Sequence, residues 1–380
     1  MKYLKSYEDH TRLFHDLMNR KAKVITYGMT DYNLTLYEHA KDVFNADTVA
    51  ANFDSNKNKW GQTLSTGVVT MPLDVLSEMA GKVDGIVVVS GAICQIGTFL
   101  ETLGLPFYFY QMMDGALPLR VEKQALYDKE QIEINSDKVC KAGSLMADLH
   151  SKNVFDSIIT ARTTGILRER FVLQNEVLTH DQYFPEWIPS FLPFNNEIFI
   201  DGGAYDGDTI RALKKLGKEN GIYKHIYAFE PDPFCYAKLS KYASDDSNIT
   251  CIKKGLHFKD TTFGLKIGDM SSRLTKAIDN DVSGAAGIIN VEVCSIDNTI
   301  KDKVTFIKLD IEGSELAALK GAKKTIRANK PKLAICIYHK IHDFWEIPLY
   351  IKEIAPDYKF YAGHHSLSYD CRETVLYASA

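Results

Sequence analysis

The sequence predicts an α/β protein with two domains, each built on a mainly parallel sheet, and with helices between them. The chain has 380 residues, which is more than one ordinary hydrophobic core contains. Short apolar runs alternate with helix-length segments both before residue 115 and after residue 191, as in repeated strand and helix units. One apolar run in the later part leads directly into a glycine-rich turn.

The first domain is predicted over residues 1–115 as the smaller, Rossmann-like parallel α/β domain. Apolar residues at helical spacing within residues 7–20 predict an opening helix. Strands are expected at 23–28, 47–53, 85–91 and 105–109, with a helix at 34–44 and another ending near residue 100. The turn after the first strand keeps Gly28 but lacks the further glycines of nucleotide-binding turns. We therefore expect this domain to pack, to form a homodimer or to position an acceptor, rather than to bind a dinucleotide.

Residues 116–190 are predicted to form a helical bridge between the two domains. This stretch is rich in helix formers and shows no sustained strand alternation. It has no proline between Pro118 and Pro185, so nothing in that interval interrupts a helix.

Charge and composition narrow the choice of partner and location. The formal net charge is -4 with both signs mixed along the chain, which argues against a nucleic-acid or membrane-surface partner. A small-molecule or carbohydrate partner fits better. No apolar run at the start has signal-peptide length and none approaches the ~20 residues of a membrane span, so we expect a cytoplasmic protein. The seven cysteines have no ligand-like spacing and are expected to be structural.

The second domain is predicted over residues 191–380. Its seven strands are expected at 198–201, 226–230, 249–253, 304–310, 333–338, 358–361 and 374–377. Two shorter strands, at 262–267 and 290–294, should form an excursion between the third and the fourth. The loop over 268–287 is rich in glycine and serine and is expected to close over an acceptor.

The end of the first strand of this domain is the most informative segment. Residues 197–209 run from an apolar strand through Asp201 into a turn that contains Gly203 and Gly207, and a helix begins near Ile210. Glycines let the backbone turn freely and let a ligand approach the bare peptide. The acids around this turn would repel a pyrophosphate, so we expect a cationic, nucleotide-like ligand.

The second strand ends at an acidic residue, Glu230, which is followed by Pro231. An acid at this strand end can accept hydrogen bonds from both hydroxyls of a ribose, and the proline stops the strand. An acid at a strand end is often exposed to water and has no ligand. Here the acid occurs together with the glycine turn, which favours ribose binding.

Acidic residues also follow the fourth strand. Asp310 and Glu312 lie in the predicted turn between strand and helix, where they should face the mouth of the cleft. Glu315 falls in the first turn of the next helix, where a carboxylate can cap the helix or take part in function, and both roles stay open.

His339 follows the fifth strand and is a candidate general base, because an unperturbed imidazole titrates near pH ~6.5. His364 and His365 lie in a later turn and are weaker candidates. Together with the acids these histidines could hold a metal, but their spacing matches no recognised ligand motif, so we predict none.

Three motifs in this order resemble the FkbM family of S-adenosylmethionine-dependent methyltransferases. They are residues 199–209, the Phe229-Glu230-Pro231 step and residues 307–322. The resemblance covers about residues 195–380. It implies a class I methyltransferase sheet of seven strands whose last strand is antiparallel, and residues 374–377 are the candidate for that strand.

The resemblance also implies roles for individual residues. The cofactor-binding residues would be Asp201, Gly203, Ala204, Tyr205, Gly207, Thr209, Glu230, Pro231 and Gly255. Glu230 would hold the ribose, and the adenine would lie near residues 254–256. Asp310, Glu312 and His339 would face the acceptor. Tyr205 stands where the family often has an asparagine.

The implied reaction is O-methylation of a hydroxyl group on a sugar or another small metabolite. The protein mainly has to align the hydroxyl oxygen, the methyl group and the sulfur of the cofactor. An alcohol also needs a base, and His339 or Asp310 is the candidate.

Two other functions stay open. An NAD(P)-dependent oxidoreductase acting on a nucleotide sugar would use one of the α/β domains, although neither first turn contains a full G-x-G-x-x-G. A non-catalytic binding module could keep the cofactor fold as a scaffold, although the retained acids argue against it.

Overall fold

The computed structural model describes the chain except residues 1–2, 6, 37–39, 91–92, 114–115, 193, 217–221, 267–272, 278–287 and 369. The chain divides into two compact units. The first unit comprises Met1–Glu130, Ser157–Glu176 and Ser366–Arg372, and the second comprises Gln131–Asp156, Val177–His365 and Glu373–Ala380. The helices of residues 116–176 are therefore shared between the two units.

The first unit contains a five-stranded sheet in the order β3-β2-β1-β4-β5, in which every pair of neighbours is parallel. The strands are β1 (Val24–Tyr27), β2 (Val49–Phe53), β3 (Thr70–Met71), β4 (Gly85–Val88) and β5 (Phe107–Phe109). Strand β1 is central and buried along its whole length, as its apolar sequence requires. The parallel α/β prediction is confirmed, and β3 is a two-residue strand too short to show in the sequence pattern.

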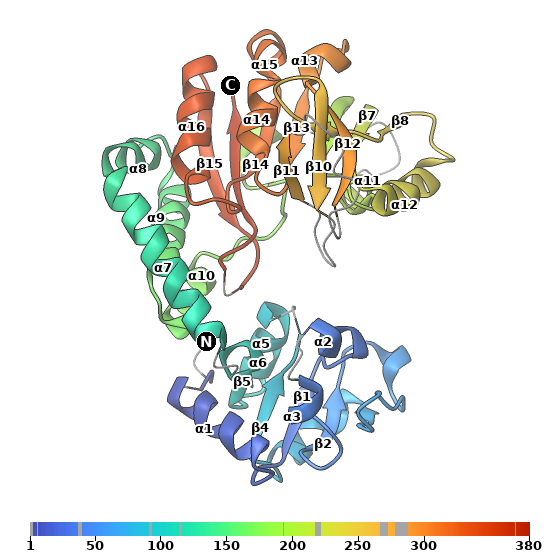
Figure 1. Cartoon of the computed structure of the whole chain (residues 1–380), viewed down its shortest axis with the longest axis vertical. Coiled ribbons are helices and arrows are strands. Elements are labelled where there is room, and N and C mark those ends of the chain that lie inside the picture. Colours follow the sequence, from blue (N-terminus) through green and yellow to red (C-terminus); the bar gives the residue numbers. More distant parts are fainter. Residues whose placement is uncertain are drawn as a thin grey trace. The chain divides into compact units, whose positions relative to one another are not determined.

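Helices of the first unit precede, connect and follow these strands (Figure 1). They are α1 (Tyr7–Met18), α2 (Asp31–Leu36), α3 (Ala40–Val43), α4 (Leu76–Ala80), α5 (Ile93–Thr102), α6 (Tyr110–Met113) and α10 (Leu167–Glu176), with short 3-10 helices at Lys57–Lys59 and Leu73–Val75. Helices α7 (Ala116–Ile134) and α9 (Leu149–Thr163) each contribute residues to both units.

The second unit contains a seven-stranded sheet, counted over the described residues, in the order β15-β16-β14-β13-β6-β7-β8. The strands are β6 (Glu197–Gly202), β7 (Tyr223–Phe229), β8 (Ile249–Ile252), β13 (Phe306–Leu309), β14 (Lys332–Cys336), β15 (Lys359–His364) and β16 (Thr374–Ser379). Strand β16 runs antiparallel to both of its neighbours, β14 and β15, and the other pairs are parallel. The predicted antiparallel last strand is therefore confirmed.

The excursion after the third strand is larger than the sequence predicts. Within the described residues it is a four-stranded sheet, in the order β11-β10-β12-β9, where two strands were expected. Its strands are β9 (Gly255–Leu256), β10 (Thr261–Lys266), β11 (Arg273–Ala277) and β12 (Ile288–Cys294). Strand β11 occupies the middle of the segment predicted as a loop over 268–287, and the rest of that segment lies outside the described residues.

Helices of the second unit are α8 (Ser136–Gly143), α11 (Asp208–Leu216), α12 (Pro233–Ala243), α13 (Ile296–Thr299), α14 (Glu315–Lys320), α15 (Lys323–Asn329) and α16 (Asp343–Ile354), with a 3-10 helix at Pro189–Phe191. The start of α12 shows why the chain turns there. Asp232 accepts hydrogen bonds from the backbone of Phe234 and Cys235, and Pro233 fits the first helical turn. Among the described residues, no helix combines the length and the apolar character needed to cross a membrane.

Candidate active site

The residues that the sequence singled out gather at one edge of the seven-stranded sheet. Strand β6 lies between β13 and β7, so the carboxyl ends of these three parallel strands meet. Asp201 is in β6, Glu230 follows β7 and Asp310 follows β13. In open α/β sheets, ligands bind beyond the carboxyl ends of strands where the strand order reverses, which is the case between β13 and β6.

A buried lysine that the sequence analysis missed connects two of these strands. Lys308 in β13 donates from Nζ to Asp201 Oδ1 at 3.0 Å and to the carbonyl oxygen of Gly203 at 2.8 Å. Both charged side chains are fully enclosed. Burial raises the pKa of Asp201 to about 6, although Lys308 works against that rise. The pair ties the glycine turn to β13.

The glycine turn depends on left-handed backbone at several positions. Gly203 has φ +75°, and a Cβ there would lie 1.9 Å from the carbonyl oxygen of Asp310. Gly207 has φ +92°, and a Cβ there would lie 2.7 Å from a ring carbon of Tyr242. Tyr205 has φ +47°, a conformation that asparagine adopts more readily than tyrosine. The turn is therefore shaped by close packing of these glycines against other parts of the chain.

Glu230 joins the glycine turn to the start of α12. Its Oε2 accepts the backbone N–H of Tyr205 at 2.9 Å, and its Oε1 accepts that of Asp232 at 2.8 Å. Burial raises the pKa of Glu230 to about 7, and the two N–H donors partly oppose that rise. Each carboxylate oxygen keeps a lone pair, so Glu230 can still accept hydrogen bonds from a ligand.

Three of the remaining predicted cofactor residues lie beside this turn or next to Glu230, and the fourth, Gly255, lies in the smaller sheet. Ala204 and Thr209 are buried beside it, and Pro231 follows Glu230 directly. Gly255 lies in β9, where it pairs with Val293.

Asp310 is held by two tyrosines that the sequence analysis did not find. The hydroxyl of Tyr183 donates to Asp310 Oδ2 at 2.8 Å, and that of Tyr338 donates to Oδ1 at 3.1 Å. Burial by itself would raise the pKa of Asp310, but Lys308, His339 and the tyrosines lower it below its ordinary value. Asp310 is therefore an oriented carboxylate.

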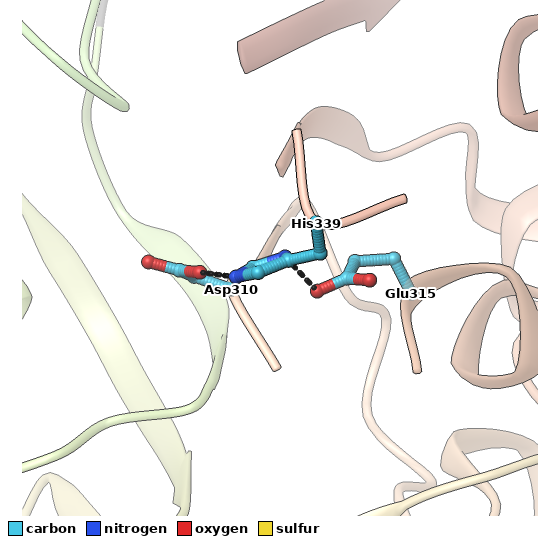
Figure 2. A group of neighbouring side chains, drawn as sticks. All are labelled: Asp310, Glu315 and His339. Carbon is cyan, nitrogen blue, oxygen red and sulfur yellow. Dashed lines mark ion pairs between the residues drawn. The ribbon is translucent and has the colours of Figure 1, made fainter. Parts of the chain in front are cut away.

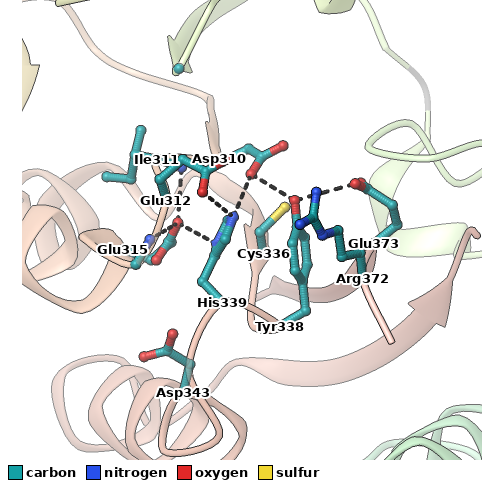
Figure 3. Close-up of polar contacts among 12 residues, drawn as sticks. Asp310, Ile311, Glu312, Glu315, Cys336, Tyr338, His339, Asp343, Arg372 and Glu373 are labelled. Atoms are coloured by element: carbon teal, nitrogen blue, oxygen red, sulfur yellow. Dashed lines mark hydrogen bonds and ion pairs between the residues drawn. The ribbon is translucent and has the colours of Figure 1, made fainter. Parts of the chain in front are cut away.

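His339 lies among three carboxylates. Its Nδ1 is 3.0 Å from Glu315 Oε1, while Nε2 is 3.5 Å from Asp310 Oδ1 and 3.7 Å from Glu312 Oε2 (Figure 3). Burial by itself would lower the pKa of His339, but the carboxylates, above all Glu315, raise it to about 9. An imidazole with that pKa is protonated at neutral pH, so His339 does not have the ordinary pKa on which its candidacy as a base depended.

Glu315 does more than begin a helix. Its side chain is fully buried, and Oε1 accepts the backbone N–H groups of Ile311 at 2.9 Å and Gly313 at 3.2 Å. These bonds stabilise a turn in which Glu312 and Gly313 both have left-handed backbone. Glu315 thus shapes the turn that carries Glu312 and also contacts His339.

This sheet, with its strand order and single antiparallel strand, has the α/β fold of the class I methyltransferases. Residues 201–365 match the sequence model of the methyltransferase FkbM domain. The chain therefore contains a methyltransferase FkbM domain, as the resemblance of its motifs implied.

The chain is similar to several solved structures. The crystal structure of methyltransferase FkbM from Methylobacillus flagellatus KT matches 99% of this chain and 94% of its own, with 22% identity and a TM-score of 0.56. An rRNA methylase from Streptococcus thermophilus matches 49% of this chain and 88% of its own, with 15% identity and a TM-score of 0.31. Aeropyrum pernix fibrillarin, with natively bound S-adenosyl-L-methionine, matches 48% of this chain and 66% of its own, with 12% identity and a TM-score of 0.30. No curated protein matches the sequence significantly.

Proposed function

We propose that this methyltransferase uses S-adenosylmethionine to methylate a hydroxyl group of a sugar or another small metabolite. The observation that carries the proposal is the close packing of the Gly203 turn between Glu230 and Asp310. On one side of the turn, bare backbone lies next to the Glu230 carboxylate, which keeps free lone pairs. On the other side, the backbone lies next to Asp310, whose carboxylate is oriented.

The cofactor side of the site fits this ligand. Asp201 Oδ2 is buried and makes no hydrogen bond with any described residue, so the turn keeps an acceptor for a cationic or donor group. Glu230 would accept hydrogen bonds from the ribose hydroxyls. S-adenosylmethionine supplies an activated methyl group when bound. The residues Gly203, Ala204, Tyr205, Gly207 and Thr209 would hold its amino-acid part.

The acceptor side fits a neutral hydroxyl compound. The side chains of Asp310 and Glu312 are 24% and 26% exposed, whereas that of His339 is 4% exposed. The carboxylates, rather than the ring, can therefore reach an acceptor and take its hydroxyl proton. The tyrosines fix Asp310, which favours the alignment that methyl transfer needs. Several acids in one place would repel an anionic acceptor.

We extend the proposal to the setting of the enzyme. We propose a cytoplasmic location and a small-molecule or carbohydrate partner. The net charge of -4, with both signs mixed along the chain, argues against nucleic-acid and membrane partners. The Rossmann-like first domain would form a homodimer or position the acceptor.

Replacing Glu230 with alanine is expected to weaken binding of S-adenosylmethionine. The variant loses the charged acceptor for the ribose and the two N–H bonds that shape the turn. A hydrogen bond to a charged group contributes about 1.5–3 kcal/mol, so the dissociation constant should rise by roughly 10- to 100-fold. Isothermal titration calorimetry of the full chain measures this change.

Glu353→Ala is the matched control, because Glu353 is an exposed acid on α16. Its affinity should equal that of the wild type. The same titration with NAD(P) distinguishes the proposed methyltransferase from an NAD(P)-dependent oxidoreductase. The proposal fails if the wild type binds NAD(P) and not S-adenosylmethionine, or if Glu230→Ala binds the cofactor as the wild type does.

The affinity for S-adenosylmethionine is expected to rise with pH. The pKa of Glu230 is raised to about 7, so the free protein holds a proton there below that pH, and the protonated carboxyl accepts hydrogen bonds less well. Because ribose binding favours the ionised form, affinity should increase roughly tenfold between about pH 6 and about pH 8.

Glu230→Gln provides the control for this pH dependence. The amino group of the cofactor titrates in the same range with both proteins, so only the difference between them reports on Glu230. We expect the variant to show a flatter profile. Parallel pH profiles of the two proteins would remove Glu230 from the cofactor site.

A further inference from the structure

Asp310, Glu315 and His339 form a compact cluster at the ends of β13 and β14. Each side chain offers one ligand atom, and these atoms all lie within 4.8 Å of one another (Figure 2). Asp310 follows β13, Glu315 begins α14 and His339 follows β14, so three separate backbone segments converge. Carboxylate oxygens and imidazole nitrogens are the donors that divalent transition metals accept from proteins.

Two buried atoms of the cluster lack hydrogen bonds. The side chain of His339 is 4% exposed, and its Nδ1 pairs with Glu315 Oε1 at 3.0 Å, whereas its Nε2 makes no hydrogen bond within the described part of the chain. The same is true of Glu315 Oε2, although the side chain of Glu315 is completely buried. Buried polar atoms are normally satisfied, so these atoms point to a ligand that completes them.

The distances from Nε2 of His339 to the nearby carboxylate oxygens fit an intervening cation better than a direct hydrogen bond. Asp310 Oδ1 at 3.5 Å and Glu312 Oε2 at 3.7 Å are too far for a normal hydrogen bond. Ligand atoms bound to one metal at roughly 2.0–2.2 Å can lie up to roughly twice that distance apart. The ligand atoms of the cluster lie within 4.8 Å of one another, and Glu315 Oε1 faces the other ring nitrogen, Nδ1, so the side chains must shift to bind one ion.

The surroundings also orient the cluster. Tyr183 and Tyr338 hold both oxygens of Asp310, and two backbone N–H groups hold Glu315 Oε1. Hydrogen bonds of this kind position metal ligands. Lys308, the buried lysine in β13, already bonds to Asp201 and two carbonyl oxygens. Three carboxylates therefore surround one imidazole ring, and that of Glu315 is completely buried.

We propose that Asp310, Glu315 and His339 bind a divalent transition cation such as Mn²⁺. The imidazole ligand favours such a metal over Mg²⁺ or Ca²⁺, which prefer oxygen ligands alone. With the cation bound, Glu312 is the neighbouring carboxylate left to take the acceptor's proton. The bound cation would polarise an acceptor hydroxyl, a role that rests on the proposed methyl transfer. Binding of the cation does not depend on that reaction.

Electron paramagnetic resonance of Mn²⁺ added to the metal-stripped full chain tests this proposal, because the signal of free Mn²⁺ falls when it binds. We expect saturable binding to the wild type and at least roughly tenfold weaker binding to Asp310→Asn and to Glu315→Gln. Asp246→Asn is the matched control, since Asp246 is 22% exposed against 24% for Asp310 and lies outside the cluster. It should bind Mn²⁺ as the wild type does.

Folding and cofactor binding are measured separately. Circular dichroism shows whether the Glu315→Gln variant folds. If it does not fold, the Asp310→Asn variant still tests the site, because the side chain of Asp310 is partly exposed. The cation site is refuted if the wild type does not bind Mn²⁺, or if Asp310→Asn and Asp246→Asn bind it equally. Titration of S-adenosylmethionine in the presence of a chelator reports on the cofactor site alone, so failure of the proposed function is distinguished from failure of the cation site.

Discussion

Replacing Gly203 with alanine is expected to abolish binding of S-adenosylmethionine and to lower the free energy of unfolding by roughly 2–5 kcal/mol. The new Cβ would lie 1.9 Å from the carbonyl oxygen of Asp310, and the backbone at φ +75° is unfavourable for any residue with a Cβ. The obstacle cannot move easily, because the N–H of Asp310 is bonded to the carbonyl oxygen of Gly202 at 3.1 Å. Relief of the clash must therefore open the turn between β6 and β13.

Thermal or urea unfolding measures the loss of stability, and calorimetry measures the loss of binding. Gly81→Ala is the matched control. Gly81 has φ −74°, and a Cβ there would meet nothing within 4 Å. Its effect on stability should stay within about 0.5 kcal/mol. A Gly203→Ala protein that unfolds and binds the cofactor like the wild type would show that the turn does not need close backbone packing.

The parts of the fold and site that could be predicted are those with a local signal. The strand before Asp201 is apolar and ends in glycines, and Glu230 follows the next strand directly. Parallel strands place their carboxyl ends at one edge of the sheet. The positions of Asp201, Glu230 and Asp310 at strand ends were therefore enough to predict that they lie close together. The seven strands of the larger sheet were found for the same reason, since each contains a short run of mainly apolar residues.

The parts that were missed depend on contacts between distant segments. Tyr183 reaches Asp310 across 127 positions of the chain, and Lys308 reaches Asp201 across 107. No spacing rule links such residues. A lysine inside an apolar strand was the one available signal, because a charge at a buried position needs a partner. The short strands β9 and β3 have two residues each, too few to show a period.

The raised pKa of His339 also could not be predicted from the sequence. It follows from three carboxylates that converge only in the folded chain, and from burial that opposes them. The sequence places Glu312 and Glu315 near each other but does not show that His339 comes between them and Asp310. The ordinary imidazole pKa was therefore the wrong starting point for this site.

Replacing Lys308 with methionine is expected to lower the free energy of unfolding by about 3–5 kcal/mol at neutral pH. The variant leaves Asp201 without its charge partner, at a position that is fully buried. Asp201 must then stay unpaired or take up a proton, and protonating a carboxyl of ordinary pKa at neutral pH costs about 4 kcal/mol. The unpaired Asp201 has a raised pKa in the folded variant, so the folded state binds more protons than the unfolded state. The loss should therefore shrink by about 1.4 kcal/mol for each unit by which the pH falls towards about 6, below which Asp201 of the wild type also takes up a proton.

This pH dependence separates an unpaired charge from poor packing, which would cost the same at each pH. Urea unfolding of the full chain at several pH values gives the comparison. The double variant Asp201→Asn/Lys308→Met should regain most of the lost stability, because it removes both charges. Lys330→Met removes a lysine whose ion pair with Asp357 is about half exposed, and its effect should stay below about 1 kcal/mol. A loss in Lys308→Met that does not change with pH, and that the double variant does not reverse, would contradict the buried pair between β6 and β13.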